Sequence, residues 1–140
     1  MTRPPASQPA AEPDSPFQRY IGYSRTDQRD GFMRLELEMR PELENPLGIP
    51  HGGLHAAMLD SAMGWAGTWT YDGSPVRKSV TLNLNVSYLA TPAPADNGIR
   101  LIAEGRKVGG GRKIFFAEGE LRDGTGRVLA RATGTFRYLD

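Results

Sequence analysis

Apolar and charged residues alternate without a break from Met33 to Arg40, within the stretch GFMRLELEMRPE at residues 31–42. The apolar side chains of this segment share one face: Met33, Leu35, Leu37 and Met39. Neighbouring side chains of a β-strand point to opposite sides of the sheet, so a period of two predicts a strand with one buried face. The residues just before it, 17–27, are predicted as a first short strand.

Four further segments favour strands. They are residues 79–90, 99–108, 113–122 and 127–139. In the first of them the apolar residues again fall on one face: Val80, Leu82, Leu84, Val86 and Tyr88. The same alternation sends Thr81 to the opposite, polar face. The glycine-rich stretches GGGR and DGTGR separate the last three segments and predict the tight turns of an antiparallel sheet.

Between the two groups of strands lies a long apolar segment that favours a helix. Residues 54–69 are dominated by Leu, Ala and Met, which are good helix formers. The apolar side chains go round nearly the whole circumference, which is typical of a helix buried on all sides. The stretch before it, NPLGIPHGG at residues 45–53, contains two prolines and three glycines and is predicted as a loop.

The predicted order is two strands, one buried helix and four strands, which indicates an α+β fold with an antiparallel sheet and one segregated helix. A curved sheet of five or six strands would wrap around the helix. Because a single sheet cannot cover a helix on every side, a second copy of the chain is expected to cover the rest. The sequence therefore predicts a single domain over residues 17–140 that forms at least a homodimer.

Length and composition agree with one compact domain and argue against several classes of protein. The chain has 140 residues, of which 39% are apolar, and a net charge of +1 from 17 basic and 16 acidic residues. Proteins that bind nucleic acids normally carry a clear basic excess, so this chain is not expected to bind a nucleic acid. With no cysteine and two histidines, a disulfide framework is impossible and a structural zinc site is not expected.

The first sixteen residues contain five prolines and three alanines, and they lack the apolar core of a signal peptide. Residues 1–16 are therefore predicted as a disordered leader. Nowhere do about 18 apolar residues run together, so no membrane span is predicted. A cytoplasmic location is the default expectation for such a chain.

A single formal charge, that of Asp60, lies between residues 45 and 71. A bare carboxylate in apolar surroundings costs roughly several kcal/mol unless it is paired or neutralised. Two interpretations follow. Either Asp60 has a structural partner or faces a solvent gap, or it is positioned for chemistry as a base or nucleophile.

Gly52 and Gly53 lie at or just before the expected start of the helix. Backbone N–H groups there lack intrahelical partners and attract negative charge, and glycine lets a ligand approach closely. The pair is thus a candidate oxyanion hole for a carbonyl under attack. Asp60 follows Gly52 by eight residues, roughly 12 Å along a helix, which is too far to serve the same carbonyl. If both groups act on one substrate, Asp60 should come from the second subunit of a dimer.

The two histidines have less specific interpretations. His51 either caps the helix or orders the loop, or it takes part in the chemistry. His55 falls in the first turn of the helix and is predicted to face solvent or a neighbouring loop. Neither histidine belongs to a metal-binding pattern such as HExxH, so no metal is expected.

In these residues the chain resembles the hotdog-fold acyl-CoA thioesterases of the phenylacetate-degradation type, within the 4-hydroxybenzoyl-CoA thioesterase superfamily. The motif consists of HGG at residues 51–53, Asn45 six residues before the histidine, and Asp60 nine residues after it. The stretch VTLNLNVSYLATPA follows downstream. The resemblance extends over about residues 31–138, in the order of the elements as well as in the motif.

The resemblance implies a curved antiparallel sheet around one long helix, in dimers that share two sites and pair into tetramers. It implies that the Gly52 N–H polarises the thioester carbonyl, and that Asp60 of the second chain activates water or attacks directly. Asn45 and His51 would help orient substrate and water, and Thr81 would help the carboxylate hold water. No cofactor is implied, because coenzyme A is part of the substrate.

Coenzyme A carries phosphates, which need cations. The segment GRKVGGGRK has four basic side chains around a glycine turn: Arg106, Lys107, Arg112 and Lys113. They are either a phosphate-binding group or the solvated charges of an ordinary hairpin. Gly53, where the backbone is open to close approach, is a further candidate for contact with the substrate.

Three functions remain open at this point. The first is a thioesterase that hydrolyses an acyl-CoA to a free acid and CoA. The second is a non-catalytic acyl-CoA-binding or sensor domain, which the presence of Asp60 and the short, proline-rich leader disfavour. The third is a hydroxyacyl-thioester dehydratase of the same fold, in which the histidine and the carboxylate usually stand in a different motif.

Overall fold

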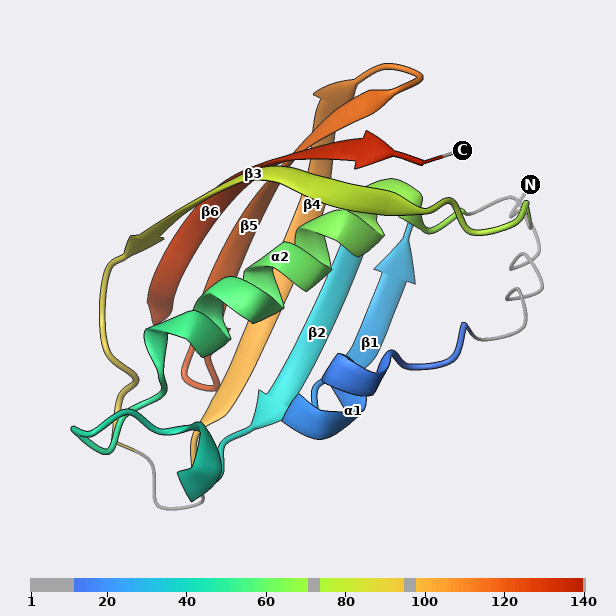
Figure 1. Ribbon diagram of the computed structural model, residues 1–140. Coiled ribbons are helices and arrows are strands. Elements are labelled where there is room, and N and C mark those ends of the chain that lie inside the picture. Colours follow the sequence, from blue (N-terminus) through green and yellow to red (C-terminus); the bar gives the residue numbers. More distant parts are fainter. Residues whose placement is uncertain (1–11, 71–73, 95–97, 140) are drawn as a thin grey trace, which may run out of the picture.

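The computed structural model describes residues 12–70, 74–94 and 98–139. In this part of the chain a curved sheet wraps one long helix (Figure 1). The helices are α1 (Pro16–Ile21), the 3-10 turn η1 (Pro41–Leu43) and α2 (Gly52–Thr68). The strands are β1 (Ser24–Arg29), β2 (Phe32–Glu38), β3 (Ser79–Tyr88), β4 (Arg100–Gly110), β5 (Ile114–Asp123) and β6 (Val128–Tyr138).

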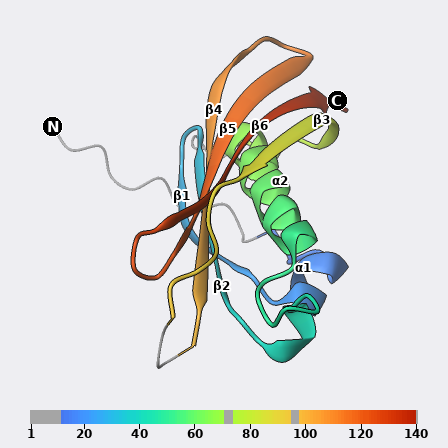
Figure 2. The same ribbon diagram turned by 90° about the vertical axis from the view of Figure 1, so that its left-hand side faces the viewer.

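The six strands are ordered β1-β2-β4-β5-β6-β3, and each neighbouring pair is antiparallel. β3 follows the long helix in sequence but joins the sheet beside the last strand, β6, so β1 and β3 form the two edges. Seen from the side, α2 lies against one face of the sheet, and α1 lies on the same side (Figure 2). The predicted α+β architecture is confirmed, with six strands.

One side of α2 packs into the concave face of the sheet and forms the core. Its inward side chains are buried: Leu54, Met58, Leu59, Ala62, Met63 and Ala66. The backbone of β4 comes very close to the helix at Gly105, where an added Cβ would lie 2.3 Å from the Ala62 carbonyl oxygen. A side chain at this position would therefore force the helix away from the sheet.

The opposite side of α2 is not covered by the sheet. Ala57, Asp60 and Gly64 are half-buried there, and Gly53 is exposed. Within a single chain the helix is thus buried on one side, not on all sides as its composition predicts. In the described part of the chain, no helix is long and apolar enough to cross a membrane.

The prediction of a strand over residues 17–27 is wrong in its first half. Helix α1 occupies that stretch, because the Ser15 hydroxyl accepts a hydrogen bond from the Gln18 N–H and a proline stands in the first turn. The helix ends at Gly22, whose φ of 98° suits glycine, and β1 follows. β2, which pairs with β1, is confirmed in its place and in its buried face.

Part of the predicted leader contacts the domain. Residues 1–11 lie outside the described residues. Beyond them, the Asp14 carboxylate accepts hydrogen bonds from the side chains of Gln18 and Arg25, at 2.9 and 3.4 Å. Asp14, which the prediction assigns to the leader, therefore contacts residues of the domain.

A β-bulge in β3 changes which side chains face the helix. The register of β3 against β6 shifts between Thr81 and Asn83, so Leu82 is an extra residue without a partner on β6. Because of this extra residue, Thr81 falls on the same face as Leu84 and Val86, which pack against the core. Strict alternation wrongly placed Thr81 on the opposite face. Three members of the predicted apolar face are exposed in the single chain: Val80, Leu82 and Tyr88.

Candidate active site

The loop before α2 is ordered around Asn45. The Asn45 side-chain oxygen accepts hydrogen bonds from the N–H groups of Leu47 (2.8 Å) and Ile49 (3.3 Å). The backbone closes the same turn, since the Asn45 N–H donates to the Ile49 carbonyl and the Gly48 N–H donates to the Asn45 carbonyl. Asn45 thus shapes the loop that brings His51 to the start of the helix.

His51 caps α2. Its backbone is extended, and its Nδ1 accepts a hydrogen bond from the Gly53 N–H at 2.8 Å. A neutral imidazole that accepts at Nδ1 carries its proton on Nε2, so the exposed ring keeps an N–H donor available. The capping interpretation is confirmed, and it leaves one ring nitrogen for contact with a substrate.

Gly52 is the first residue of α2, two residues earlier than the predicted start. Its N–H has no intrahelical carbonyl to bond, as is normal in the first turn of a helix. No hydrogen bond between residues that the structure describes uses this donor. The Gly52 N–H is therefore open, and it lies at the positive end of the helix dipole.

The Asp60 carboxylate lies in an open cleft beside α2. Its Oδ1 accepts a hydrogen bond from the Thr81 hydroxyl at 2.7 Å. No cation of the described residues forms an ion pair with it. The cleft has a volume of about 310 Å³, and its other walls include Trp65, Thr68, Arg77, Lys78 and Phe136. Asp60 therefore combines one hydroxyl partner with open space, which favours the interpretation as a carboxylate available for chemistry.

Gly52 and Asp60 lie on the same helix, eight residues apart. With a rise of about 1.5 Å per residue, the two positions are about 12 Å apart along the axis. One carbonyl group cannot contact both the Gly52 N–H and the Asp60 carboxylate of a single chain. Each chain thus presents an open donor at the helix start and, two turns further on, an open acceptor.

The four basic residues predicted around the β4–β5 turn do not form one group. Arg106 and Lys107 are neighbours in a strand, so they point to opposite faces of the sheet. Arg106 lies on the convex face, with its guanidinium carbon 4.7 Å from the centre of the Phe32 ring. Lys107 lies on the concave side, with its Nζ 5.9 Å from the centre of the Tyr138 ring. Arg106 is thus separated from the other three.

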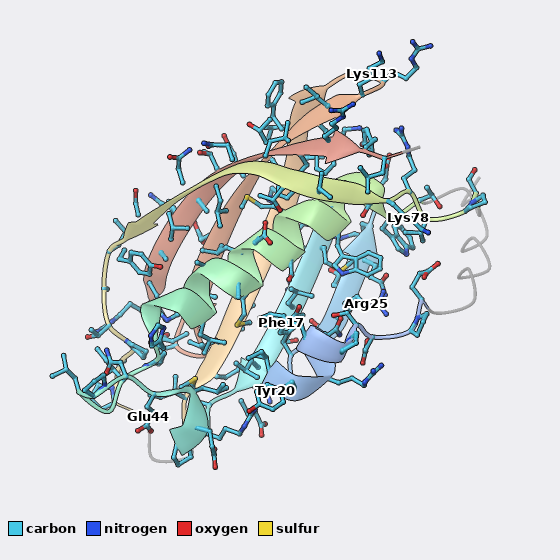
Figure 3. All side chains as sticks on the ribbon, viewed as in Figure 1. Phe17, Tyr20, Arg25, Glu44, Lys78 and Lys113 are labelled. Carbon is cyan, nitrogen blue, oxygen red and sulfur yellow. The ribbon has the colours of Figure 1, made fainter. Side chains whose placement is uncertain are left out.

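Basic residues lie instead around the end of β6 that carries Tyr138, two of them by side-chain contacts and three by backbone contacts. The Arg77 guanidinium carbon lies 3.4 Å from the centre of the Tyr138 ring, and Arg77 donates a hydrogen bond to the Arg112 carbonyl at 3.1 Å. The carbonyls of Lys78 and Lys113 both accept hydrogen bonds from the end of β6. Figure 3 labels Lys113 at the end of the β4–β5 hairpin and Lys78 just before β3. This basic cluster comprises Arg77, Lys78, Lys107, Arg112 and Lys113.

Arg77 and Lys78 join the basic cluster to the cleft of Asp60, because both residues line that cleft. The sequence prediction missed them, since it considered only the cations of the glycine-rich hairpin. The signal that could have found them is an Arg-Lys pair just before β3, the strand that brings Thr81 to Asp60.

His55 is buried, which contradicts the prediction that it faces solvent. It is 5% exposed, and its ring stacks on Tyr88 with a distance of 5.9 Å between ring centres. Burial lowers the pKa of His55 below its ordinary value, so the ring is neutral at neutral pH. Neither ring nitrogen has a hydrogen-bond partner within the described part of the chain. Tyr88 lies on the same face of β3 as Leu84 and Val86, and its ring helps to cover His55.

Comparisons with known sequences agree with this geometry. Residues 47–130 match the sequence profile of the Thioesterase superfamily, and the chain belongs to this family. A Halobacterium salinarum protein named "Putative esterase VNG_1336C" is 32% identical over 86% of this chain and 82% of its own length. Mouse acyl-coenzyme A thioesterase 13 is 29% identical over 71% of this chain and 68% of its own length.

Solved structures show the same fold. Protein BH2602 of Bacillus halodurans, solved with CoA, is 28% identical with a TM-score of 0.76, over 91% of this chain and 80% of its own. The E. coli PaaI protein from the phenylacetic acid degradation operon is 16% identical with a TM-score of 0.78, over 91% of this chain and 86% of its own. The predicted hotdog fold is thus confirmed. Family membership and thioesterase relatives support thioester hydrolysis in general.

Proposed function

We propose that the protein hydrolyses acyl-CoA thioesters to a free acid and CoA. The observation that carries the proposal is the Asp60–Thr81 pair, in an open cleft on the same helix as the open N–H of Gly52. Hydrolysis of a thioester requires an acceptor for a proton of water and a donor to the oxygen that becomes negative. Both groups lie within residues 47–130, the segment that matches the Thioesterase superfamily.

A homodimer with antiparallel α2 helices would complete the site. The uncovered side of α2 carries small residues such as Ala57 beside Asp60, which allows a second helix to approach. β3 is an edge strand of ten residues with Val80 and Leu82 exposed, and an edge of this kind invites pairing with another strand. Two chains joined along β3 would bring their α2 helices side by side, with Asp60 of one chain opposite Gly52 of the other.

In the proposed reaction the thioester oxygen accepts a hydrogen bond from the Gly52 N–H of one chain. The Asp60 carboxylate of the other chain takes a proton from a water molecule, whose oxygen forms a bond to the thioester carbon. The helix start stabilises the negative charge that develops on the thioester oxygen. When the C–S bond breaks, the proton passes from Asp60 to the leaving thiolate. Apart from the CoA of the substrate, no cofactor takes part.

The neighbouring residues have supporting roles in this proposal. Because the Thr81 hydroxyl occupies one oxygen of Asp60, the other oxygen is left for the water. His51 offers its Nε2–H as a second donor near the carbonyl, and Asn45 holds the loop that carries His51. Gly53 has no side chain, so the substrate can pass close to the backbone of the first helical turn.

The phosphates of CoA are proposed to bind the basic cluster, which Arg77 and Lys78 connect to the cleft. The relative from Bacillus halodurans that was solved with CoA supports this ligand. Lys78→Gln should raise KM for acyl-CoA roughly two- to fivefold, the scale of one exposed charge contact, and should leave KM for an acyl-pantetheine unchanged. Arg106→Gln on the convex face is the matched control and should change neither KM.

The proposal is tested by release of the CoA thiol from a panel of aliphatic and aromatic acyl-CoAs. We expect steady release, with one equivalent of free acid for each thiol. The Asp60→Asn variant, purified in the same way, controls for contaminating thioesterases. Tight binding of acyl-CoA measured by calorimetry, with no release above that control for any member of the panel, would support the sensor alternative instead.

A further inference from the structure

The peptide group between Gly52 and Gly53 is held at both of its polar ends by side chains. The carbonyl of this peptide belongs to Gly52 and accepts a hydrogen bond from the Tyr88 hydroxyl at 2.6 Å. The N–H belongs to Gly53 and donates to His51 Nδ1 at 2.8 Å. Tyr88 comes from the edge strand β3 and His51 from the loop before α2, so two separate elements fix one peptide plane.

This peptide needs external support because of its sequence and its place. Two successive glycines restrict the backbone less than any other pair of residues. The first turn of a helix also has few internal hydrogen bonds. Here the bond from the His55 N–H to the His51 carbonyl is long, with 3.4 Å between nitrogen and oxygen. This peptide turns about ψ of Gly52 and φ of Gly53, and it meets the preceding peptide, which carries the Gly52 N–H, at the Gly52 Cα. Holding the Gly52 carbonyl in place therefore limits how far Gly52 can shift and redirect its N–H. The donor at the centre of the proposed chemistry thus depends on contacts outside the helix.

Tyr88 is itself fixed from two sides, although its side chain is 55% exposed. Its ring lies against the helix start, where a Cβ at Gly52 would be 3.4 Å from the nearest ring carbon. Its other contact is the stacked ring of His55, which is buried and has no hydrogen-bond partner among the described residues. With no hydrogen bond to orient it, the His55 ring serves as a flat packing surface that keeps the tyrosine hydroxyl over the Gly52 carbonyl.

We propose that Tyr88 is a positioning residue for thioester hydrolysis: its hydroxyl holds the Gly52 carbonyl, and this anchor keeps Gly52 in the position in which its N–H points at the substrate carbonyl. This role rests on the proposed function. Tyr88 acts through the peptide and does not touch the reacting atoms. Since the Gly52 N–H matters most when the carbonyl oxygen becomes negative, loss of the hydroxyl should lower kcat and leave KM nearly unchanged.

The test uses Tyr88→Phe, which removes the hydroxyl and keeps the ring. We expect kcat to fall about five- to tenfold, the scale of one neutral hydrogen bond, with KM within about twofold of the wild-type value. Tyr20→Phe is the matched control, because Tyr20 is 81% exposed on α1 and its hydroxyl makes no hydrogen bond with any described residue. The control should keep the wild-type kcat.

An infrared measurement separates positioning from a structural role. The probe is a ketone analogue of acyl-CoA in which a methylene replaces the sulfur, so the carbonyl remains but cannot be hydrolysed. Hydrogen bonding from Gly52 should lower the carbonyl stretching frequency of the bound analogue, and Tyr88→Phe should reduce that lowering. Because only folded, ligand-bound protein gives this signal, the result also holds if the variant is less stable.

The outcomes distinguish the positioning role from the proposed function. If the wild-type protein releases no thiol from any acyl-CoA, the proposed function fails and the role of Tyr88 fails with it. If the wild-type protein hydrolyses acyl-CoA but Tyr88→Phe keeps both kcat and the carbonyl frequency, the positioning role alone is overturned. A lower thermal midpoint with unchanged kcat and frequency would assign Tyr88 a purely structural role.

Discussion

The carboxylates of Asp123 and Asp60 differ in how many donors surround them. Asp123 is 3% exposed, and its oxygens accept four hydrogen bonds, three from backbone N–H groups and one from a threonine hydroxyl. The donors come from the loop after β3 and the β5–β6 turn: Ala93, Thr125 and Arg127. Asp60 is half-buried and accepts one hydrogen bond from the part of the chain that the structure describes, that of Thr81.

We expect this difference to separate a structural carboxylate from a reactive one. Burial acts to raise the pKa of Asp123, but the Thr125 hydroxyl and the backbone N–H groups lower it by more, so the net shift is downward. Its lone pairs are used to pin two loops together. Asp60 keeps lone pairs that face the cleft, just as the Gly52 N–H remains an open donor. We expect the open groups to control the rate and the satisfied group to control stability.

Removal of the open donor should have the largest effect. Proline suits the first position of a helix after an extended residue, so Gly52→Pro deletes the N–H with little change to the fold. We expect kcat for acyl-CoA hydrolysis to fall about 10²–10³-fold, the usual cost of losing one oxyanion donor. Gly52→Ala keeps the N–H and is the matched control, since its Cβ would lie at an ordinary distance, 3.4 Å, from the Tyr88 ring. Equal turnover by the two variants would exclude the oxyanion role.

Removal of the open acceptor comes next. Asp60→Asn keeps the shape of the side chain and can still accept the Thr81 hydrogen bond, but it cannot take a proton from water. We expect kcat to fall about 10²-fold or more, as for loss of a general base. The thermal midpoint, followed by circular dichroism, should hold or rise, because a partly desolvated charge is removed. Normal turnover with a lower midpoint would place Asp60 in the same structural class as Asp123.

The reverse result is expected at the satisfied carboxylate. Asp123→Asn replaces one oxygen by an NH₂ group, which would face a backbone or hydroxyl donor that needs an acceptor. We expect the free energy of unfolding in urea to fall by about 1–3 kcal/mol, the cost of leaving a buried donor unpaired. Turnover of the folded variant should stay within about twofold of the wild-type value, since Asp123 lies outside the Asp60 cleft. Lost turnover at unchanged stability would contradict the structural role that we assign to Asp123.

A smaller effect is expected on the acid side of the stability curve. The folded-state pKa of Asp123 lies below its ordinary value of about 3.9, so its ionisation contributes stability that is complete above that value. The contribution is lost as the pH falls through the folded-state pKa, because the carboxyl is then protonated in both states. Between about pH 6 and pH 3 the wild-type chain should therefore lose more unfolding free energy than Asp123→Asn. Equal losses would show that Asp123 is not the group responsible.

Periodicity was sufficient to predict most of the fold. β2, α2 and the three strands β4, β5 and β6 lie where alternation and helix-forming residues indicated. The prediction failed where one local feature overrides the pattern. The extra residue Leu82 reverses the alternation of inward and outward side chains in β3 and brings Thr81 to Asp60. Such a bulge cannot be predicted from the alternation of apolar and polar residues. A capping serine likewise makes a helix of residues 16–21, which looked extended from their composition.

The site was predictable in its residue types more than in its arrangement. Asp60 and Gly52 could be chosen because a lone charge and a glycine pair are unusual in an apolar helix. The burial of His55 could not be predicted, because it depends on Tyr88 from a strand more than 30 residues away in sequence. The separation of Arg106 from the other cations follows from the two faces of β4. The homodimer and the pairing of dimers into tetramers both stay predictions.

The most direct test of a site shared between subunits is to mix two inactive variants. The Gly52→Pro chain lacks the donor and keeps the carboxylate, and the Asp60→Asn chain has the opposite defect. After subunit exchange, verified by mass spectrometry of intact dimers, each mixed dimer contains one site with both changes and one site with neither. We expect the mixture to recover about one quarter of wild-type activity, since about half of the dimers are mixed and each has one intact site of two. If exchange is complete and the mixture is no more active than the separate variants, Gly52 and Asp60 do not form a site between two chains.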